Sequence, residues 1–237
     1  MYRQHEDTPG WDRSKANRLY KALKKLIVDF KVPPDTRLDP RLISVTLKTS
    51  VTPLREALIQ IETEKYIVGS PRNGYYTRKL DTKQLSDEYG VANAILQGVF
   101  RQGPDEHSKL WSTLPTIPSS NDCILFGEFL EVFYEKIAEG GNNGKMLDLV
   151  HEFNIRTRYV RLLDLQRPER LSCIISDMRQ LVELLDKQDK NGVIANIGRQ
   201  FSAIIENVPE LVLEGNLRAG DTKESWLKTL LSNFDES

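Results

Sequence analysis

The stretch from Pro40 to Arg78 constrains the fold most strongly, because it predicts two helices and a two-stranded ribbon with few residues between them. In the first helix, Leu42, Ile43 and Leu47 fall on one face, and the polar residues that follow interrupt the pattern. A short helix, a turn, a second helix and a ribbon, in that order, predict a winged helix-turn-helix, a fold that binds DNA.

The second helix of this stretch is predicted to begin at Thr52 or Pro53. The missing N–H of proline costs nothing in a first helical turn, and the hydroxyl of Thr52 can cap the exposed amides. Its apolar residues recur at spacings of three and four, which buries one face: Leu54, Ala57, Leu58 and Ile61. Arg55 is then exposed near the helix N-terminus, where a guanidinium can bind O6 and N7 of a guanine. Arg55 is therefore the first candidate for base reading.

The ribbon is predicted from two segments of β-forming composition, Tyr66–Val68 and Tyr75–Thr77. Between them, Arg72, Asn73 and Gly74 can form a tight turn that tolerates positive φ. An isolated pair of such segments would suggest an ordinary surface hairpin. Because this pair directly follows a helix-turn-helix, we predict a wing with Arg72 at its tip.

The string SVTPLREAL, followed by a helix, a strand and RNGY, resembles the GntR family of bacterial transcription regulators. The family pattern usually reads VSxTPVREAL. The resemblance implies DNA-binding roles for Arg41, Ser50, Val51, Thr52, Arg55, Arg72, Asn73 and Gly74. Val51 departs from the family, because many members place an arginine there that contacts the operator. We therefore expect operator sequence or affinity to differ from the family norm.

The charge of the chain is divided unevenly between its two parts. The net charge of the 237 residues is −1, but residues 1–80 contain 16 Lys and Arg against 9 Asp and Glu, a balance of +7. Residues 81–237 contain 17 against 25, a balance of −8. A positive module attracts DNA phosphates, whereas the negative remainder is not expected to contact DNA.

The helical pattern sets the predicted domain boundaries. Residues 14–30 read as an amphipathic helix that Pro33 and Pro34 end, and strand signals vanish from Asp81 onward. Later helical periods lie near 83–101, 122–139, 143–165, 169–187, 190–206 and 221–234. The predicted fold class is mainly α, with an N-terminal winged helix-turn-helix (α+β) joined to a C-terminal all-α bundle. The predicted boundaries are a flexible N-terminus at 1–12, a DNA-binding domain at 13–79 and a helical effector-binding and dimerisation domain at 80–237, with an internal loop at 103–120.

The C-terminal domain resembles the FCD group of GntR regulators in helix count, in size and in the string FLEVFYEKIAEGGNN. Many FCD domains hold a divalent metal with an Asp and a His four residues apart and two later histidines. The resemblance places Leu130, Tyr134, Met178 and Gln200 at those four positions. None is a good ligand for a hard divalent ion, so no metal and no other cofactor is predicted. Glu131 and Glu135 share one helical face and could bind a cation, but such pairs are more often solvated.

Metal-free sensor domains of this type can bind an acyl-type ligand or a small organic acid. Arg156 flanks the inward stripe of the helix at 143–165, and with Tyr134 it could clamp a carboxylate or phosphate. Two alternatives remain open: Arg156 pairs with Glu152 or reaches solvent, and Tyr134 only fills core volume. The candidate effector-binding residues are Tyr134, Arg156, Met178 and Gln200.

We expect a homodimer that binds a near-palindromic operator in double-stranded DNA, because symmetric half-sites double the base contacts of one small winged unit. A metabolite is expected to change its DNA affinity, and the resemblance favours a repressor. The alternative is a DNA-binding protein whose helical domain is a dimerisation or protein-partner module without ligand. An enzyme is not expected, because the helical half contains no nucleophile–base pair and no phosphate loop.

The cysteines and the hydropathy pattern predict the compartment. Cys123 and Cys173 lie in apolar contexts without CxxC spacing, which favours buried thiols in a reducing compartment. No apolar run approaches the roughly 20 residues of a membrane span, and the N-terminus has no apolar core. We therefore expect a cytoplasmic protein that does not bind membranes.

Overall fold

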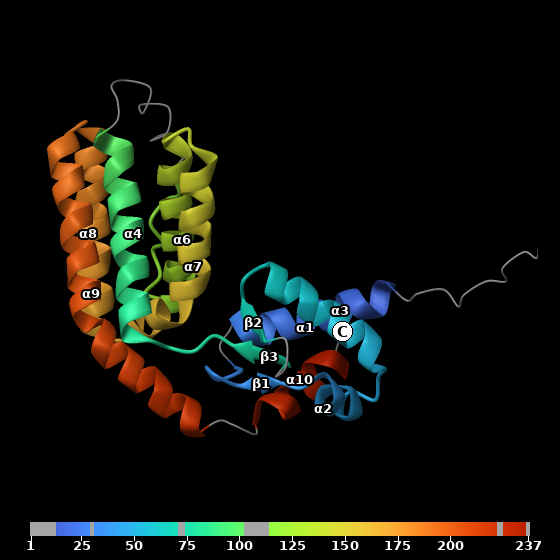
Figure 1. Cartoon of the computed structure of the whole chain (residues 1–237). Helices are drawn as coiled ribbons and strands as arrows, with labels where there is room; N and C mark the ends of the chain where they lie inside the picture. The colour runs from blue at the N-terminus through green and yellow to red at the C-terminus, as the bar shows by residue number, and fades with distance from the viewer. Residues whose placement is uncertain (1–12, 29–30, 71–73, 102–113, 222–224, 236–237) are drawn as a thin grey trace, which may run out of the picture. The chain divides into compact units, whose positions relative to one another are not determined.

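The computed structural model describes residues 13–28, 31–70, 74–101, 114–221 and 225–235, which fall into two compact units (Figure 1). One unit, called the reader here, joins the chain up to Arg78 with the C-terminal helix. The other, called the bundle, spans Lys79–Asp221, and all of its described regular elements are helices. A winged helix-turn-helix followed by a helical domain is therefore confirmed as the fold class.

The reader is built from helices around a small sheet. Its elements are α1 (Arg13–Val28), β1 (Arg37–Leu38), α2 (Pro40–Thr46), α3 (Val51–Thr63), β2 (Ile67–Ser70), β3 (Gly74–Thr77) and α10 (Ser225–Asp235). The strands pair antiparallel in the order β1-β3-β2, with Leu38 opposite Tyr75 and Val68 opposite Tyr76. The predicted wing is thus present, and β1 adds a third strand too short to have a sequence pattern of its own.

Two local expectations for the reader are wrong. Helix α3 begins at Val51 with Ser50 as its N-cap residue, so Thr52 lies inside the first turn and does not cap the helix. Leu42 is 52% exposed rather than buried. Asp39 caps α2, which starts at Pro40, and the short helix buries the face of Ile43 and leaves Leu42 toward solvent.

The C-terminal helix α10 completes the core of the reader. It packs against α1 and α2, and its Trp226 and Leu230 are 3% and 0% exposed within the reader's apolar cluster. The sequence-based boundaries had placed this segment in the helical domain at 80–237. Its periodicity predicts an amphipathic helix but cannot tell which apolar core the helix joins, so only the structure assigns it to the reader.

We predict that Trp226→Ala lowers the free energy of unfolding of the reader by about 3–5 kcal/mol, because it removes a large buried side chain and leaves a cavity. The measurement is equilibrium urea denaturation of the full chain. Leu231→Ala on the same helix is the control, because Leu231 is 38% exposed and should change stability by less than about 1 kcal/mol. Equal effects of the two substitutions would show that α10 does not belong to the reader core.

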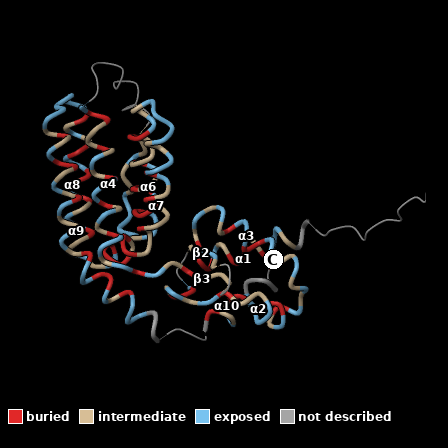
Figure 2. Tube along the Cα trace, viewed as in Figure 1, coloured by how far each residue is buried: buried red, intermediate tan, exposed pale blue. Residues whose placement is uncertain are grey.

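The bundle consists of α4 (Thr82–Arg101), α6 (Cys123–Gly140), α7 (Gly144–Leu165), α8 (Pro168–Asp186) and α9 (Lys190–Asp221). Helix α7 contacts each of the other four helices, and buried residues in Figure 2 lie between the helices. Helix α9 runs past the predicted end near residue 206 and through Pro209. Val208 and Leu211 are fully buried beside this proline, so core packing offsets the roughly 3 kcal/mol that an internal proline costs.

The cysteines differ from the sequence-based expectation. Cys173 is exposed and Cys123 is half-buried, and both are free thiols. The prediction that both thiols are buried was wrong, because a helix turns adjacent residues to different faces and apolar sequence neighbours therefore do not imply burial. No helix among the described residues is long and apolar enough to cross a membrane.

Candidate DNA-binding groove and bundle cavity

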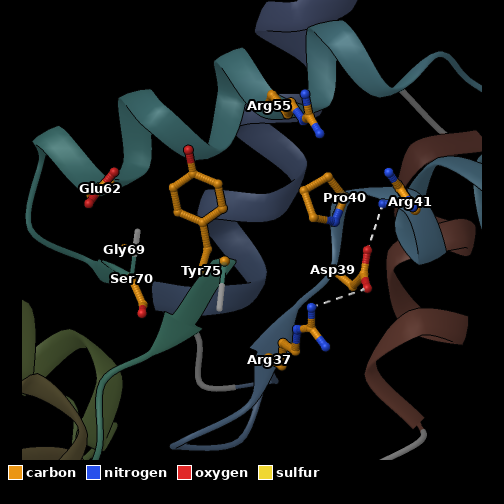
Figure 3. Close-up of a pocket in the computed structure, with 10 residues that line it drawn as sticks. Arg37, Asp39, Pro40, Arg41, Arg55, Glu62, Gly69, Ser70 and Tyr75 are labelled. Carbon is orange, nitrogen blue, oxygen red and sulfur yellow. Dashed lines mark hydrogen bonds and ion pairs between the residues drawn. The ribbon is translucent and has the colours of Figure 1, made fainter. Parts of the chain in front are cut away.

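A groove of about 660 Å³ crosses the reader between α3, the sheet and the start of α2 (Figure 3). Three arginines line it from three different elements: Arg37 from β1, Arg41 from α2 and Arg55 from α3. All three are exposed. Guanidinium groups bind phosphates and guanine edges, so this arrangement suits the polyanionic surface of a nucleic acid.

Arg55 is held in the first half of α3 by the burial of the opposite helix face. Leu54 and Leu58 are 0% exposed, whereas Arg55 points away from the core. Among the described residues, no carboxylate forms an ion pair with Arg55. Its charge and its donors therefore remain available for a partner.

Asp39 organises the other two arginines of the groove. Its Oδ1 accepts the backbone N–H of Arg41 at 2.8 Å, and its Oδ2 lies 3.8 Å from the guanidinium of Arg37. An exposed pair at that separation contributes little stability, so Arg37 can exchange Asp39 for a phosphate at small cost. Arg37 was not a sequence candidate, because two residues of strand give no pattern from which to predict its position.

Tyr75 closes the groove from the sheet side. In Figure 3 its ring points from β3 toward α3, between Glu62 and Arg55. Burial raises the pKa of the Tyr75 hydroxyl; the carboxylate of Glu62 raises that pKa further, and Arg55 opposes both. The Glu62 carboxylate also covers Gly69, where a Cβ would lie 2.2 Å from its Oε1. Gly69 thus allows the end of α3 to lie close against the wing.

The remaining predicted DNA-binding residues lie at the start of α3 and in the wing. Ser50 and Thr52 are exposed and Val51 is half-buried. Gly74 lines the groove and has a φ of +89°, the conformation that the predicted wing turn requires. The structure therefore brings Arg41, Arg55 and Gly74 together in one groove. Arg72 and Asn73 lie outside the described residues.

A polar cluster fixes the C-terminal end of α3 against α1. Glu64 accepts a hydrogen bond from the Tyr20 hydroxyl at 2.7 Å and an ion-paired one from Lys24 Nζ at 2.7 Å. Lys24 also lies over the Tyr66 ring, 4.8 Å from its centroid. Burial alone would raise the pKa of Glu64, but the hydrogen bonds from Lys24 and Tyr20 outweigh it and lower that pKa.

We predict that Glu64→Gln lowers the free energy of unfolding at pH 7 by about 1–2 kcal/mol, because it removes a charge-assisted interaction. Glu64 has a lowered pKa in the fold, so its contribution is present above the unfolded-state pKa and disappears as the pH falls through the folded-state pKa. Urea denaturation at a series of pH values from 7 downward measures it. The difference between the two proteins should shrink in acid.

Glu183→Gln is the control for that experiment, because Glu183 faces Lys187 at 3.8 Å with both side chains about 70% exposed. It should change stability by less than about 0.5 kcal/mol at every pH. A Glu64→Gln effect that stays constant from neutral pH into acid would contradict the assigned role of the carboxylate.

A small cavity of about 50 Å³ lies inside the bundle. Three of the predicted positions, Leu130, Tyr134 and Gln200, line it. Met178 is fully buried but is not a lining residue, and Arg156 lies elsewhere. Arg156 bonds to Glu88 at 2.5 Å and to Glu152, which is the alternative pairing considered from the sequence.

The residues at the four resemblance-derived metal positions do not fit a divalent metal. Leu130 offers no donor atom, and burial raises the pKa of Tyr134 to about 12, which keeps its hydroxyl protonated. The described residues contain no group of three His, Cys, Asp or Glu that could hold a metal ion. Glu131 and Glu135, the other candidate pair, bond instead to neighbours on α7: Glu131 to Arg158 and Arg161, and Glu135 to His151 and Asn154.

Residues 15–76 match the profile described as "Bacterial regulatory proteins, gntR family", and all the residues that line the groove lie within that range. The N-terminal helix-turn-helix domain of this chain is thus of the GntR type. This confirms the family predicted from the SVTPLREAL string; the FCD assignment of the second domain remains a prediction.

Proteins that are similar to this chain over most of its length are also named as transcriptional regulators. The Nta operon transcriptional regulator of Aminobacter aminovorans is 26% identical over 208 residues, covering 83% of this chain and 98% of that protein. The HTH-type transcriptional repressor RspR of Escherichia coli (strain K12) is 20% identical, covering 84% and 91%. A putative GntR regulator from Rhodococcus sp. RHA1 has the same fold, with a TM-score of 0.59, 15% identity, and coverage of 85% and 98%. These relatives are named as regulators, which confirms the prediction that the chain is not an enzyme.

Proposed function

We propose that this GntR regulator binds a near-palindromic operator as a homodimer in the bacterial cytoplasm, and that a small metabolite in the bundle changes its DNA affinity. The observation that carries the proposal is the groove in which Arg37, Arg41 and Arg55 converge from three elements. Arg55 reads a guanine in the major groove of DNA, while Arg37 and Arg41 hold the phosphates beside it.

The homodimer follows from the size of the reader. One winged unit contacts few base pairs, whereas two copies on symmetric half-sites double the base contacts and the buried surface. The acidic composition of residues 81–237 supports a division of roles, because a negative bundle repels DNA and leaves binding to the reader.

The sign of regulation is proposed as repression that the metabolite relieves. RspR, a relative over most of this chain, is named a transcriptional repressor. A metabolite that binds the bundle more tightly in the state with low DNA affinity shifts the population toward that state and releases the operator.

A second candidate function is supported by the aromatic packing of the bundle. Tyr89, Tyr134, Phe153 and Phe201 form a contiguous cluster with ring centroids 5.1 to 6.2 Å apart. Such a cluster fills most of the interior, so the bundle could serve as a dimerisation or partner-binding module without ligand. A thermal stabilisation that is specific for a small molecule separates the two candidates, because a ligand that binds the folded state raises the melting temperature.

We predict that Arg55→Ala weakens operator binding by about tenfold to a hundredfold, equivalent to about 1–3 kcal/mol for a bidentate guanine contact. The measurement is footprinting and salt-dependent binding on the chain's own promoter fragment. The wild-type protein should protect a near-palindrome, and its affinity should fall steeply as salt rises.

Arg179→Ala is the charge-matched control, because Arg179 is exposed on α8 of the bundle. It should leave the footprint and the affinity unchanged. Absence of a specific footprint from the wild-type protein, or equal losses in the two variants, would refute the proposed role of the groove.

A further inference from the structure

Helix α3 leaves one large apolar side chain uncovered on its outward face. Ile59 is 51% exposed, although Leu58 beside it is 0% exposed in the reader core. The structure describes the whole of α3, and no other large apolar residue of this helix is exposed. Hydration of a half-exposed isoleucine is unfavourable, so a partner that covers Ile59 with an apolar group gains free energy.

Ile59 lies one helical turn from Arg55 on the same side of α3. Positions four residues apart on a helix are separated by about 6 Å along its axis and by about 40° around it. Arg55 and Glu62 both line the groove, so α3 borders the groove over about two turns, and position 59 falls between them (Figure 3). Ile59 is therefore next to the surface that Arg55 contacts.

The carboxylates of α3 leave this surface to the arginines. Glu62 is directed at the wing, because a Cβ on Gly69 would lie 2.2 Å from its Oε1. Glu56 is about 100° around the helix from Arg55, and Ile59 lies between them. The three guanidinium groups that line the groove place positive charge beside Ile59. This charge favours a polyanion over an apolar protein surface as the partner of Ile59.

DNA offers one apolar group that fits such a side chain. Among the base edges in the major groove, only thymine carries a methyl group, at C5, and apolar side chains contact it. Isoleucine is β-branched, so its χ1 angle is nearly fixed in a helix. A side chain held in one rotamer loses little entropy on contact, which suits Ile59 to detect a single methyl group.

We propose that Ile59 reads a thymine by packing on its C5-methyl group, within about two base pairs of the guanine that Arg55 binds. The separation follows from about 6 Å between the two helix positions and about 3.4 Å per base pair. Val51, four residues before Arg55, is half-buried and offers less apolar surface. The inference rests on the proposed function and adds one base to the sequence that the operator contains.

The test replaces each thymine of the footprinted operator in turn by uracil, which lacks the methyl group and keeps the same hydrogen-bonding atoms. Binding is measured for the full-length wild-type protein and for Ile59→Ala, Ile59→Val and Val91→Ala. At one thymine in each half-site, uracil should weaken wild-type binding about fourfold, the change expected when one buried methyl group is lost. Ile59→Ala should bind the thymine and uracil operators equally.

Two variants and a melting curve control this experiment. Ile59→Val keeps a branched apolar side chain and should retain most of the thymine preference. Val91 is 50% exposed on α4 of the bundle, so Val91→Ala removes an equally exposed side chain and should retain the full preference. Ile59→Ala should melt at the wild-type temperature, because substitutions of exposed side chains change stability little.

The inference is overturned if uracil weakens wild-type binding at no thymine, or if the loss is equal in wild-type protein and Ile59→Ala. It is also overturned if Ile59→Ala changes the oligomeric state and leaves the thymine preference intact, because Ile59 then contacts a second copy of the chain. Operator binding that depends on Arg55 without any effect of uracil refutes only the thymine contact. Wild-type protein without a specific footprint refutes the proposed function itself.

Discussion

The burial of one face of α3 is the constraint on which DNA recognition by this chain depends. Leu54, Leu58 and Ile61 are fully buried, and that packing fixes which residues of the helix face outward. The contact of Glu64 with Tyr20 and Lys24 then locks the far end of α3 against α1. Arg55 is thereby presented by a rigid element, which lowers the entropy lost when it binds a base.

In the bundle, helix α7 is fixed by a buried face that is polar rather than apolar. Helix α7 carries Asn154, Thr157, Arg161 and Asp164 at spacings of three and four, and all four are at most 5% exposed. Each is hydrogen-bonded, so the bundle core contains a satisfied polar stripe beside an aromatic cluster. Burying the charge of Arg161 is costly, and its fixed partners Glu131 and Thr157 offset that cost.

The sequence predicted most elements because their signals are local. Apolar spacing located the helices, and the RNG turn located the wing, where Gly74 adopts the expected positive φ. The assignments that failed depend on tertiary contacts. The partner of α10 and the strand β1 that carries Arg37 both depend on which surfaces meet in space. The polar stripe on α7 did have a sequence signal, because its four residues recur at helical spacing on the face of Phe153.

The most direct test of base reading by Arg55 combines the Arg55→Ala substitution with the removal of single acceptor atoms from the DNA. Each guanine of the footprinted operator is replaced in turn by 7-deazaguanine, which lacks the N7 acceptor, and binding is measured for wild-type protein and for Arg55→Ala. If Arg55 reads a guanine, the replacement should weaken wild-type binding about tenfold or more at one position in each half-site and should have no further effect in the variant. Additive losses from the replacement and the variant at every guanine would contradict base reading by Arg55.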